Sequence, residues 1–264
     1  MNMIEVSHVT VVRGRRPILR DISLHVEQGT CCAVVGPNGS GKSTLLSLLA
    51  GYTWPSAGKV AIAGHLFGRV NLADVRRQIG LIEPSRMPGF SNRVRLRELI
   101  ATGFFGSVML PISTPVSPDQ WRRVDTEIRA MGLAGRKRDV FGSLSTGERM
   151  KALIARAMVS GASILLLDEP TVGLDIGARA AFMSTLEDLV TRPQSPTVVI
   201  VSHHLDELPR NVDTVVLMKE GSIFDTGRPD EILTSEKLSR LYDCHVHVFQ
   251  RNGRYAATAR IEGA

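Results

Sequence analysis

The sequence predicts an α/β fold with a parallel sheet, and three observations carry this prediction. Short apolar runs typical of buried strands recur along the chain, among them Cys31–Val35 and Ile164–Leu167. Stretches with helical spacing separate several of these runs. A glycine-rich loop stands between the first of these runs and a helical stretch. At 264 residues the chain is long enough for one large α/β domain or two small ones.

The first third of the chain predicts strands around one helix. Apolar and polar residues alternate over Ile4–Val26 around Gly14–Pro17, which indicates two paired strands joined by a turn. A helical stretch follows the glycine-rich loop and ends at Gly51. Two further short runs predict strands, 58–64 between glycines and 79–82, which leads into a loop over 83–89.

The middle of the chain has helical spacing. Residues 95–131 place apolar side chains on helical faces, and Ser117 caps a second helix that Gly132 ends. A proline-rich connection over 110–118 separates the two helices. We expect a small helical subdomain, about residues 94–160, that stands out from the core.

The last part of the chain returns to alternating helices and strands. Helices are expected at 149–159 and 179–190, with a short one at 205–210. Buried strands are expected at 163–167, 197–201 and 214–218, the last being the final core strand. Residues 245–259 alternate around Asn252-Gly253, which predicts a hairpin. No metal site is expected at Cys244–His247, because no second pair of ligands matches it.

The glycine-rich loop fits the pattern G-x-x-x-x-G-K-[ST]. It comprises Gly36, Pro37, Asn38, Gly39, Ser40, Gly41, Lys42, Ser43 and Thr44. Glycines let consecutive backbone N–H groups turn inward, and the following helix adds its positive end. We expect Lys42 to reach the β- and γ-phosphates and the Ser43 hydroxyl to ligate Mg²⁺. A chance glycine turn is the alternative, but the flanking strand and helix favour a nucleoside triphosphate site.

Composition indicates a globular chain of a reducing compartment. Apolar residues make up 43% of the chain, yet no stretch approaches the ~20 apolar residues needed to span a bilayer. The first residues show no secretory signal pattern, and three cysteines form no disulfide framework. The cytoplasm is the expected location.

The chain carries an excess of positive charge. Its 32 basic and 26 acidic residues give a net charge of +6, with several arginine clusters. Such an excess is compatible with nucleic-acid binding, but aromatic residues make up only 5% and do not interleave with the arginines. A solvated basic face, beside anionic lipid headgroups, explains the charge equally well.

Three polar residues follow predicted buried strands. Asp168 and Glu169 end one run, and His203 comes shortly after the strand at 197–201. Ligands bind at the carboxyl edge of open α/β sheets, so we expect all three there. Asp168 is expected to hold Mg²⁺ through water, Glu169 to polarise a water that attacks the γ-phosphate, and His203 to contact that phosphate. The alternative is a pair of solvent-facing carboxylates and a structural histidine.

A further motif precedes the predicted helix at 149–159. It consists of Ser145, Thr146, Gly147 and Glu148. Ser145 is a good helix cap, and Gly147 leaves backbone N–H groups bare near the positive helix end. On spacing alone, an ordinary capping box is the favoured interpretation.

The order of these motifs resembles the ATP-binding cassette (ABC) ATPase family. The resemblance rests on Gly36–Thr44, Leu144–Glu148, Ile164–Pro170, Gly173–Asp175 and Ser202–His203, and covers about residues 4–242. It implies a RecA-like P-loop core, an antiparallel β subdomain and an inserted helical subdomain. Residues 1–242 would form the ABC ATPase domain, and 243–264 a C-terminal β-hairpin extension.

The resemblance also implies partners and roles. Two copies, or one copy and a different ATPase chain, would clasp two ATP molecules head to tail. Ser145, Thr146, Gly147 and Glu148 would form the signature that meets the partner's nucleotide, with Ser145 and Gly147 contacting the γ-phosphate. Asp175 would couple the two sites.

Three positions depart from the family pattern. No glutamine lies within 83–92; its place falls on Pro84 or Met87, and Glu83 or Ser85 are candidate substitutes. The signature has Thr146 and Glu148 where the family has glycine and glutamine. The aromatic residue that stacks on adenine in the family aligns with Arg13, whose planar guanidinium can stack instead.

We therefore expect the ATP-hydrolysing subunit of an ABC transporter, peripheral at the inner face of the cell membrane. ATP and Mg²⁺ are the expected cofactors, a separate membrane permease is the expected partner, and no stable nucleic-acid partner is expected. Residues 221–242 and 103–107 resemble importer subunits for iron complexes, cobalamin or molybdate. The alternatives are a soluble ABC ATPase acting in iron–sulphur assembly or on nucleic acid, and a small-molecule kinase, which would leave the signature unexplained.

Overall fold

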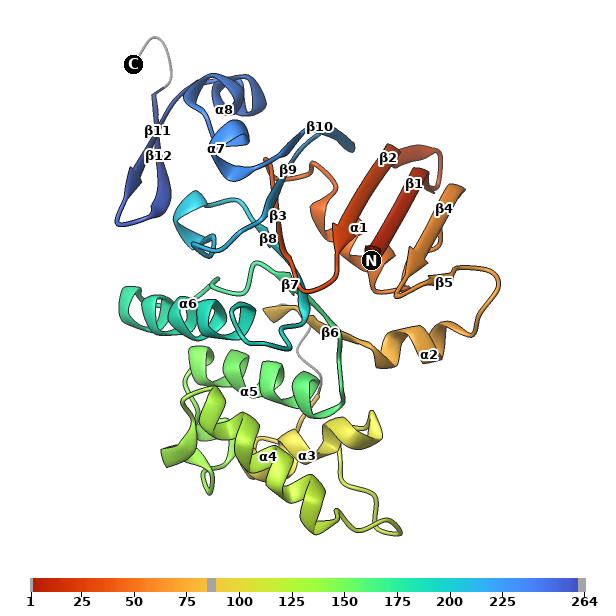
Figure 1. Cartoon of the computed structure of the whole chain (residues 1–264), viewed down its shortest axis with the longest axis vertical. Coiled ribbons are helices and arrows are strands. Elements are labelled where there is room, and N and C mark those ends of the chain that lie inside the picture. Colours follow the sequence, from red (N-terminus) through yellow and green to blue (C-terminus); the bar gives the residue numbers. More distant parts are fainter. Residues whose placement is uncertain (1, 85–88, 261–264) are drawn as a thin grey trace.

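The architecture is built on a six-stranded sheet, seen in a computed structural model that describes residues 2–84 and 89–260 (Figure 1). The spatial order of its strands is β10-β9-β3-β8-β7-β6. They are β3 (Cys31–Val35), β6 (Ile79–Ile82), β7 (Ile164–Asp168), β8 (Thr197–Ser202), β9 (Thr214–Lys219) and β10 (Ser222–Gly227). All neighbours pair in parallel except β10, which is antiparallel to β9. The predicted parallel α/β core is confirmed.

The register of the parallel strands brings their carboxyl ends to one edge. Val35 pairs with Ser202, Asp168 with Val201, and Ile82 with Leu167. The residues that follow these strands therefore gather on the same side of the sheet.

Strand β10 corrects the prediction that 214–218 is the last core strand. The turn before it uses Glu220 and Gly221, both with positive φ, of 50° and 82°. Glutamate is an uncommon first residue for such a turn, and the local sequence therefore does not indicate this hairpin. As an edge strand, β10 is mostly half-buried and lacks the apolar run that marks central strands.

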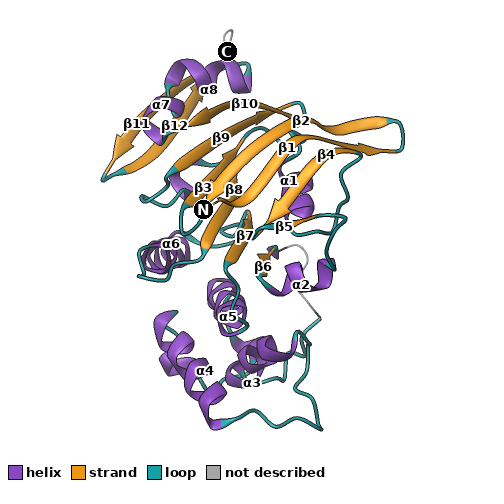
Figure 2. Ribbon diagram, turned by 45° about the vertical axis from the view of Figure 1, so that its right-hand side comes forward, coloured by secondary structure: helices purple, strands orange, loops and turns teal. Residues whose placement is uncertain are grey.

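A second, antiparallel sheet covers the helix that follows β3 (Figure 2). Its order is β2-β1-β4-β5, with β1 (Asn2–Arg13), β2 (Arg16–Glu27), β4 (Ala57–Ile62) and β5 (His65–Leu66). Helix α1 (Lys42–Leu49) shares one buried cluster with the inner faces of both sheets. This packing holds the start of α1, and so the glycine-rich loop, in place.

A group of helices forms the far end of the molecule (Figure 1). It contains α3 (Leu96–Ala101), the 3₁₀ turn η2 (Thr102–Phe105), α4 (Pro118–Ala130) and α5 (Thr146–Val159). Ser117 forms the predicted cap of α4, and Gly132, with φ of 69°, follows its end. Val124 and Ile128 of α4 belong to the same buried cluster as Leu165 of the sheet, so one core joins the two parts.

The remaining helices connect these parts, and several bounds differ from prediction. They are α2 (Leu72–Arg77), α6 (Ile176–Val190), α7 (Pro229–Ile232) and α8 (Ser235–Tyr242), with short 3₁₀ turns η3 (Ala134–Arg136), η4 (Phe141–Ser143) and η5 (Leu205–Glu207). The expected helix at 205–210 stops after one turn, because Leu208 precedes a proline and is extended. No described helix is long and apolar enough to cross a membrane.

The chain ends in the predicted hairpin, β11 (His245–Arg251) and β12 (Arg254–Arg260). Asn252 and Gly253 form its turn with φ of 52° and 74°. The hairpin packs on α8 and on η5, and Val246 is buried. Arg254 Nη2 lies 2.8 Å from Glu187 Oε1 on α6, and the same oxygen accepts a hydrogen bond of 3.1 Å from the Arg210 amide.

Candidate functional site

The glycine-rich loop joins β3 to α1, and its backbone adopts conformations that favour glycine. Gly39 and Gly41 have φ of 79° and 101°, which side chains disfavour. A Cβ on Gly36 would lie 2.2 Å from the Met218 carbonyl oxygen, so only glycine fits there. The loop therefore needs its glycines for its own shape, as the pattern predicted.

Lys42 folds back over the start of this loop. Its Nζ donates to the carbonyl oxygens of Gly36 at 2.7 Å and Pro37 at 3.0 Å. Burial lowers the pKa of Lys42, while Glu169 and Asp168 act to raise it. The Ser40 hydroxyl is buried and has no hydrogen-bond partner among the described residues. A bound phosphate would partner both groups.

Asp168 is the last residue of β7 and is 8% exposed. Burial raises the pKa of this carboxyl, Glu83 and Glu169 raise it further, and a hydrogen bond from Ser43 opposes the rise. Within the described part of the chain, its Oδ1 is buried without a partner. Carboxylate and hydroxyl oxygens are ligands that Mg²⁺ prefers, so Asp168 and Ser43 fit this ion.

Glu169 and His203 meet across the edge of the sheet. His203 Nδ1 lies 3.0 Å from Glu169 Oε1, although the residues are 34 positions apart. Glu169 has φ of 47°, a left-handed conformation that is costly for a non-glycine residue. Its amide donates to the Val201 carbonyl at 3.0 Å, which holds the strained residue in place. The predicted gathering of Asp168, Glu169 and His203 at one edge is thus observed.

The signature residues lie at the start of α5, where Ser145 and Glu148 form a reciprocal capping box. Ser145 Oγ accepts from the Glu148 amide at 3.3 Å, and Glu148 Oε2 accepts from the Ser145 amide at 2.8 Å. A Cβ on Gly147 would meet its own chain no closer than 3.6 Å. The fold of this chain therefore gives no steric reason for a glycine there. Among the described residues, no hydrogen bond or ion pair joins this motif to the glycine-rich loop.

Two further predicted residues have local structural roles. Asp175 caps α6, because its Oδ1 accepts from the Ala178 amide at 2.7 Å. Arg13 is exposed and pairs with Arg16 across the turn between β1 and β2. Of the two candidate substitutes for the missing glutamine, Glu83 lies near Asp168 and acts on its pKa, whereas Ser85 lies outside the described residues. Of the two positions where the glutamine aligns, Met87 also lies outside them.

Comparisons with known proteins agree with this arrangement. A family model described as "ABC transporter" matches residues 19–172. "Uncharacterized ABC transporter ATP-binding protein YlmA" of Bacillus subtilis is 31% identical over 96% of this chain and 95% of that protein. The hemin import ATP-binding protein HmuV of Shewanella denitrificans is 29% identical over 91% of this chain and 93% of that protein. A solved inward-facing ABC transporter described as metal-chelate type matches with a TM-score of 0.80 at 24% identity, over 99% of both chains.

Proposed function

The chain belongs to the ABC transporter family as an ATP-binding and ATP-hydrolysing subunit, and from this premise we propose that hydrolysis takes place at the edge of its six-stranded sheet. One observation carries the assignment of residues. Glu169 and His203 are in contact at 3.0 Å, beside the glycine-rich loop over which Lys42 folds. The loop amides and Lys42 bind the β- and γ-phosphates.

Glu169 then polarises the attacking water, and its carboxylate is the group that can accept the proton. His203 holds Glu169 at the sheet edge and faces the γ-phosphate. Ser43 and, through water, Asp168 are the residues that would hold Mg²⁺, which neutralises phosphate charge when bound. Arg13 is the proposed contact of adenine, through its exposed guanidinium.

A second ATPase chain completes each site in this proposal. Ser145, Thr146, Gly147 and Glu148 face the partner's nucleotide, which accounts for a glycine that its own chain does not require. Asp175 is the residue proposed to couple the two sites. Two apolar residues near it in the sequence are exposed, Val172 at 49% and Ile176 at 88%. Such side chains are expected where a partner covers them. The partner is a second copy or a different ATPase chain.

The permease is proposed to dock in a cavity of about 760 Å³ between α2, β6, η2 and α5. Its lining combines apolar residues such as Phe104, Phe105 and Leu153 with Arg76 and Arg156. Because α2, η2 and α5 border this cavity and Glu83 lines it, the helices and the loop that follows β6 would pass the closing motion to the permease. The subunit would then lie at the cytoplasmic face of the cell membrane.

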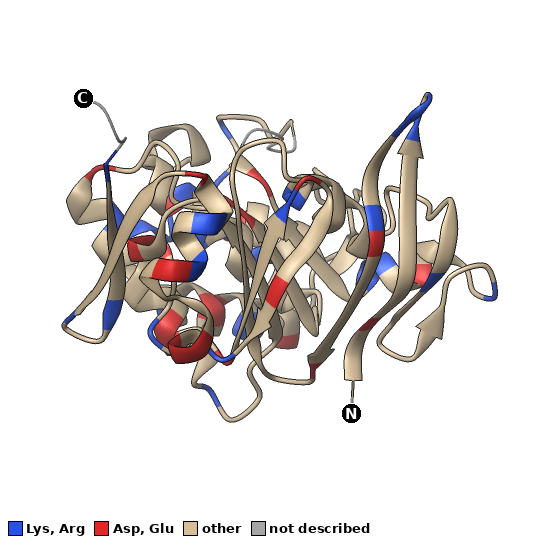
Figure 3. Cartoon of the chain, turned by 90° about the horizontal axis from the view of Figure 1, so that it is seen from above, with Lys and Arg blue, Asp and Glu red and all other residues tan. Residues whose placement is uncertain are grey.

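The proposed division of the chain is 1–242 as the ABC ATPase domain, with helices over 94–160, and 243–264 as an extension. The hemin import relative supports import as the direction of transport. No stable nucleic-acid partner is proposed, since basic and acidic residues are interspersed over the molecule (Figure 3).

Lys42→Ala tests the site. ATP turnover of the purified chain should fall at least a hundredfold, because the β- and γ-phosphates lose their cation. Lys59→Ala removes an exposed lysine of β4 and is the matched control, which should keep its turnover. Equal turnover in both variants would contradict the proposal. Purification of the native complex should recover a multispanning membrane protein, whereas a soluble partner or nucleic acid would contradict the transport assignment.

A further inference from the structure

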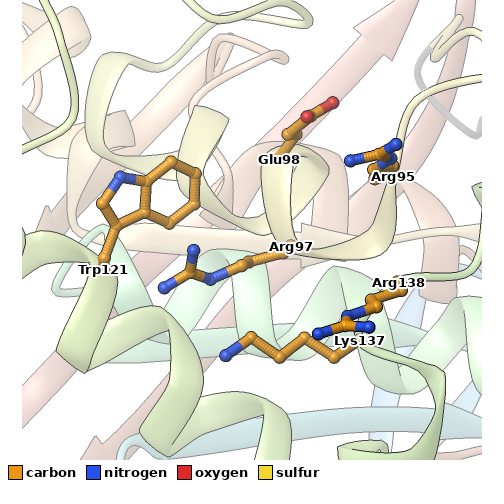
Figure 4. A pocket seen from close by; sticks show the side chains of 6 residues that line it. All are labelled: Arg95, Arg97, Glu98, Trp121, Lys137 and Arg138. Carbon is orange, nitrogen blue, oxygen red and sulfur yellow. The ribbon is translucent and has the colours of Figure 1, made fainter.

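A separate cavity of about 360 Å³ lies among the helices (Figure 4). None of its lining residues belongs to the glycine-rich loop or to the sheet edge. The lining contains four cations, one carboxylate and one indole, namely Arg95, Arg97, Lys137, Arg138, Glu98 and Trp121. This volume falls at the lower end of the range of small-molecule sites.

The backbone fixes the two arginines that lie across the cavity from Trp121 (Figure 4). Arg95 forms an antiparallel bridge with Val140, and the Leu96 amide donates to the Asp139 carbonyl at 2.9 Å. The segments that carry Arg95 and Arg138 are therefore tied side by side. Neither guanidinium has an ion-pair partner in residues 2–84 or 89–260, and both residues are exposed. Two free positive charges thus face the same cavity.

The other two cations are already held. Arg97 Nε and Nη2 donate to the two carboxylate oxygens of Asp125 at 2.9 and 3.0 Å, and Lys137 Nζ reaches Asp125 Oδ2 at 2.7 Å. The Arg97 guanidinium also lies 4.2 Å from the centroid of the Trp121 ring. These contacts fix Arg97 and Lys137 on one side of the cavity, next to the Trp121 ring.

We propose that this cavity binds a phosphate group attached to a hydroxylated carbon skeleton. Arg95 and Arg138 supply paired donors for the phosphate oxygens. The Glu98 carboxylate repels a bare phosphate but accepts a hydrogen bond from a hydroxyl group, and Trp121 packs against carbon. A soluble polyol phosphate and a phosphatidylglycerol headgroup both present this chemistry.

The test uses the full chain with Trp54→Phe, which leaves Trp121 as the single fluorescent indole of the sequence. Trp54 stacks on Phe67 outside the cavity, so phenylalanine preserves that contact. Saturating ADP fills the nucleotide site. Titration with glycerol 3-phosphate should change Trp121 fluorescence saturably, and more tightly than titration with inorganic phosphate.

Arg95→Gln with Arg138→Gln should weaken binding of glycerol 3-phosphate at least tenfold. Arg15→Gln with Arg16→Gln removes the same charge from the exposed β1–β2 turn and should change binding less than twofold. Glu98→Ala should abolish the preference for glycerol 3-phosphate over inorganic phosphate. Unchanged melting temperatures confirm that each variant is folded.

Vesicles distinguish the two sources of the phosphate. If the source is lipid, the chain should float with phosphatidylglycerol vesicles and not with phosphatidylcholine vesicles. Of the two double variants, only Arg95/Arg138 should fail to float with phosphatidylglycerol vesicles. If the source is soluble, glycerol 3-phosphate binds and the vesicles do not, and the Arg95/Arg138 double variant weakens this binding. No binding of either probe, or equal weakening by the Arg15/Arg16 control, would overturn the proposal.

Discussion

Glu169 is a carboxylate whose position the fold controls closely. Its backbone has the positive φ of 47°, and His203 contacts its side chain from the loop that follows the neighbouring strand β8. Strained residues persist only where the surroundings fix them, and such residues gather at active sites. This geometry is consistent with a group that must meet one water molecule in one orientation.

Glu169→Gln is predicted to keep ATP binding and to lower turnover by roughly 10²–10⁴, about 3–5 kcal/mol of barrier, because the amide is a poor proton acceptor. Steady-state turnover and nucleotide binding should be measured on the same preparation. Glu5→Gln makes the same exchange at an exposed position of β1 and should leave turnover nearly intact. Near-normal hydrolysis by Glu169→Gln would remove this residue from its proposed role.

At the scale of the element, Asp125 joins three segments. It lies on α4 and binds Arg97 of α3 and Lys137 of the segment after η3. Burial acts to raise its pKa, but hydrogen bonds from Arg97 and Lys137 outweigh this and hold the pKa below its usual value. The ionised form therefore stabilises the packing of the helices.

Asp125→Asn is predicted to lower the free energy of unfolding by about 1–2 kcal/mol near neutral pH, because both cations lose a charged acceptor. The folded pKa is lowered, so this stability is present above the unfolded pKa of about 3.9 and is lost as the pH falls through the folded pKa. Denaturant unfolding should show a smaller difference in the free energy of unfolding between the parent chain and Asp125→Asn at pH 3 than at pH 7. Asp119→Asn, which affects an exposed pair with Arg122 on the same helix, should cost less than about 0.5 kcal/mol.

The bounds of helices show what the sequence predicted and what it did not. Apolar periodicity located α5 and α6, but both begin three residues earlier than expected, at Thr146 and Ile176. Both helices follow capping residues, Ser145 and Asp175, and the sequence pattern indicated a cap only at Ser145. The short helices α2 and α8 were not predicted. Helix α2 has only six residues and one buried side chain, and α8 has only eight residues, although its Leu238, Leu241 and Tyr242 follow helical spacing.

The same limit applies to the sites. The edge of the sheet was predictable, because strand ends in a parallel sheet must meet there. The cavity beside Trp121 was not, because it depends on a pairing between Arg95 and Val140 that no local pattern indicates. The contacts of Asp125 with Arg97 and Lys137 were not predictable for the same reason, because they join residues 28 and 12 positions apart.

At the scale of the whole molecule, the proposed sites are complete only in a pair of ATPase chains. Ser145→Arg should leave ATP binding to a single chain intact, yet prevent ATP-driven dimerisation, because the long cation would occupy the space of the partner's γ-phosphate. Light scattering measures this ATP-driven dimerisation. It should be done in a Glu169→Gln background, because slow hydrolysis there keeps ATP bound. Ser184→Arg on the exposed face of α6 is the control and should still dimerise. A dimer that persists with Ser145→Arg would contradict the shared-site proposal.

The terminal hairpin contacts the segment that follows His203, a residue of the proposed hydrolysis site. Strand β12 rests on η5, which begins two residues after His203, and Arg254 anchors it to Glu187. A chain shortened before β11 would lose this packing and the Arg254–Glu187 contact. The segment that carries His203 should then be more mobile. Affinity tags and truncations at this end should therefore be chosen with the hydrolysis rate in mind.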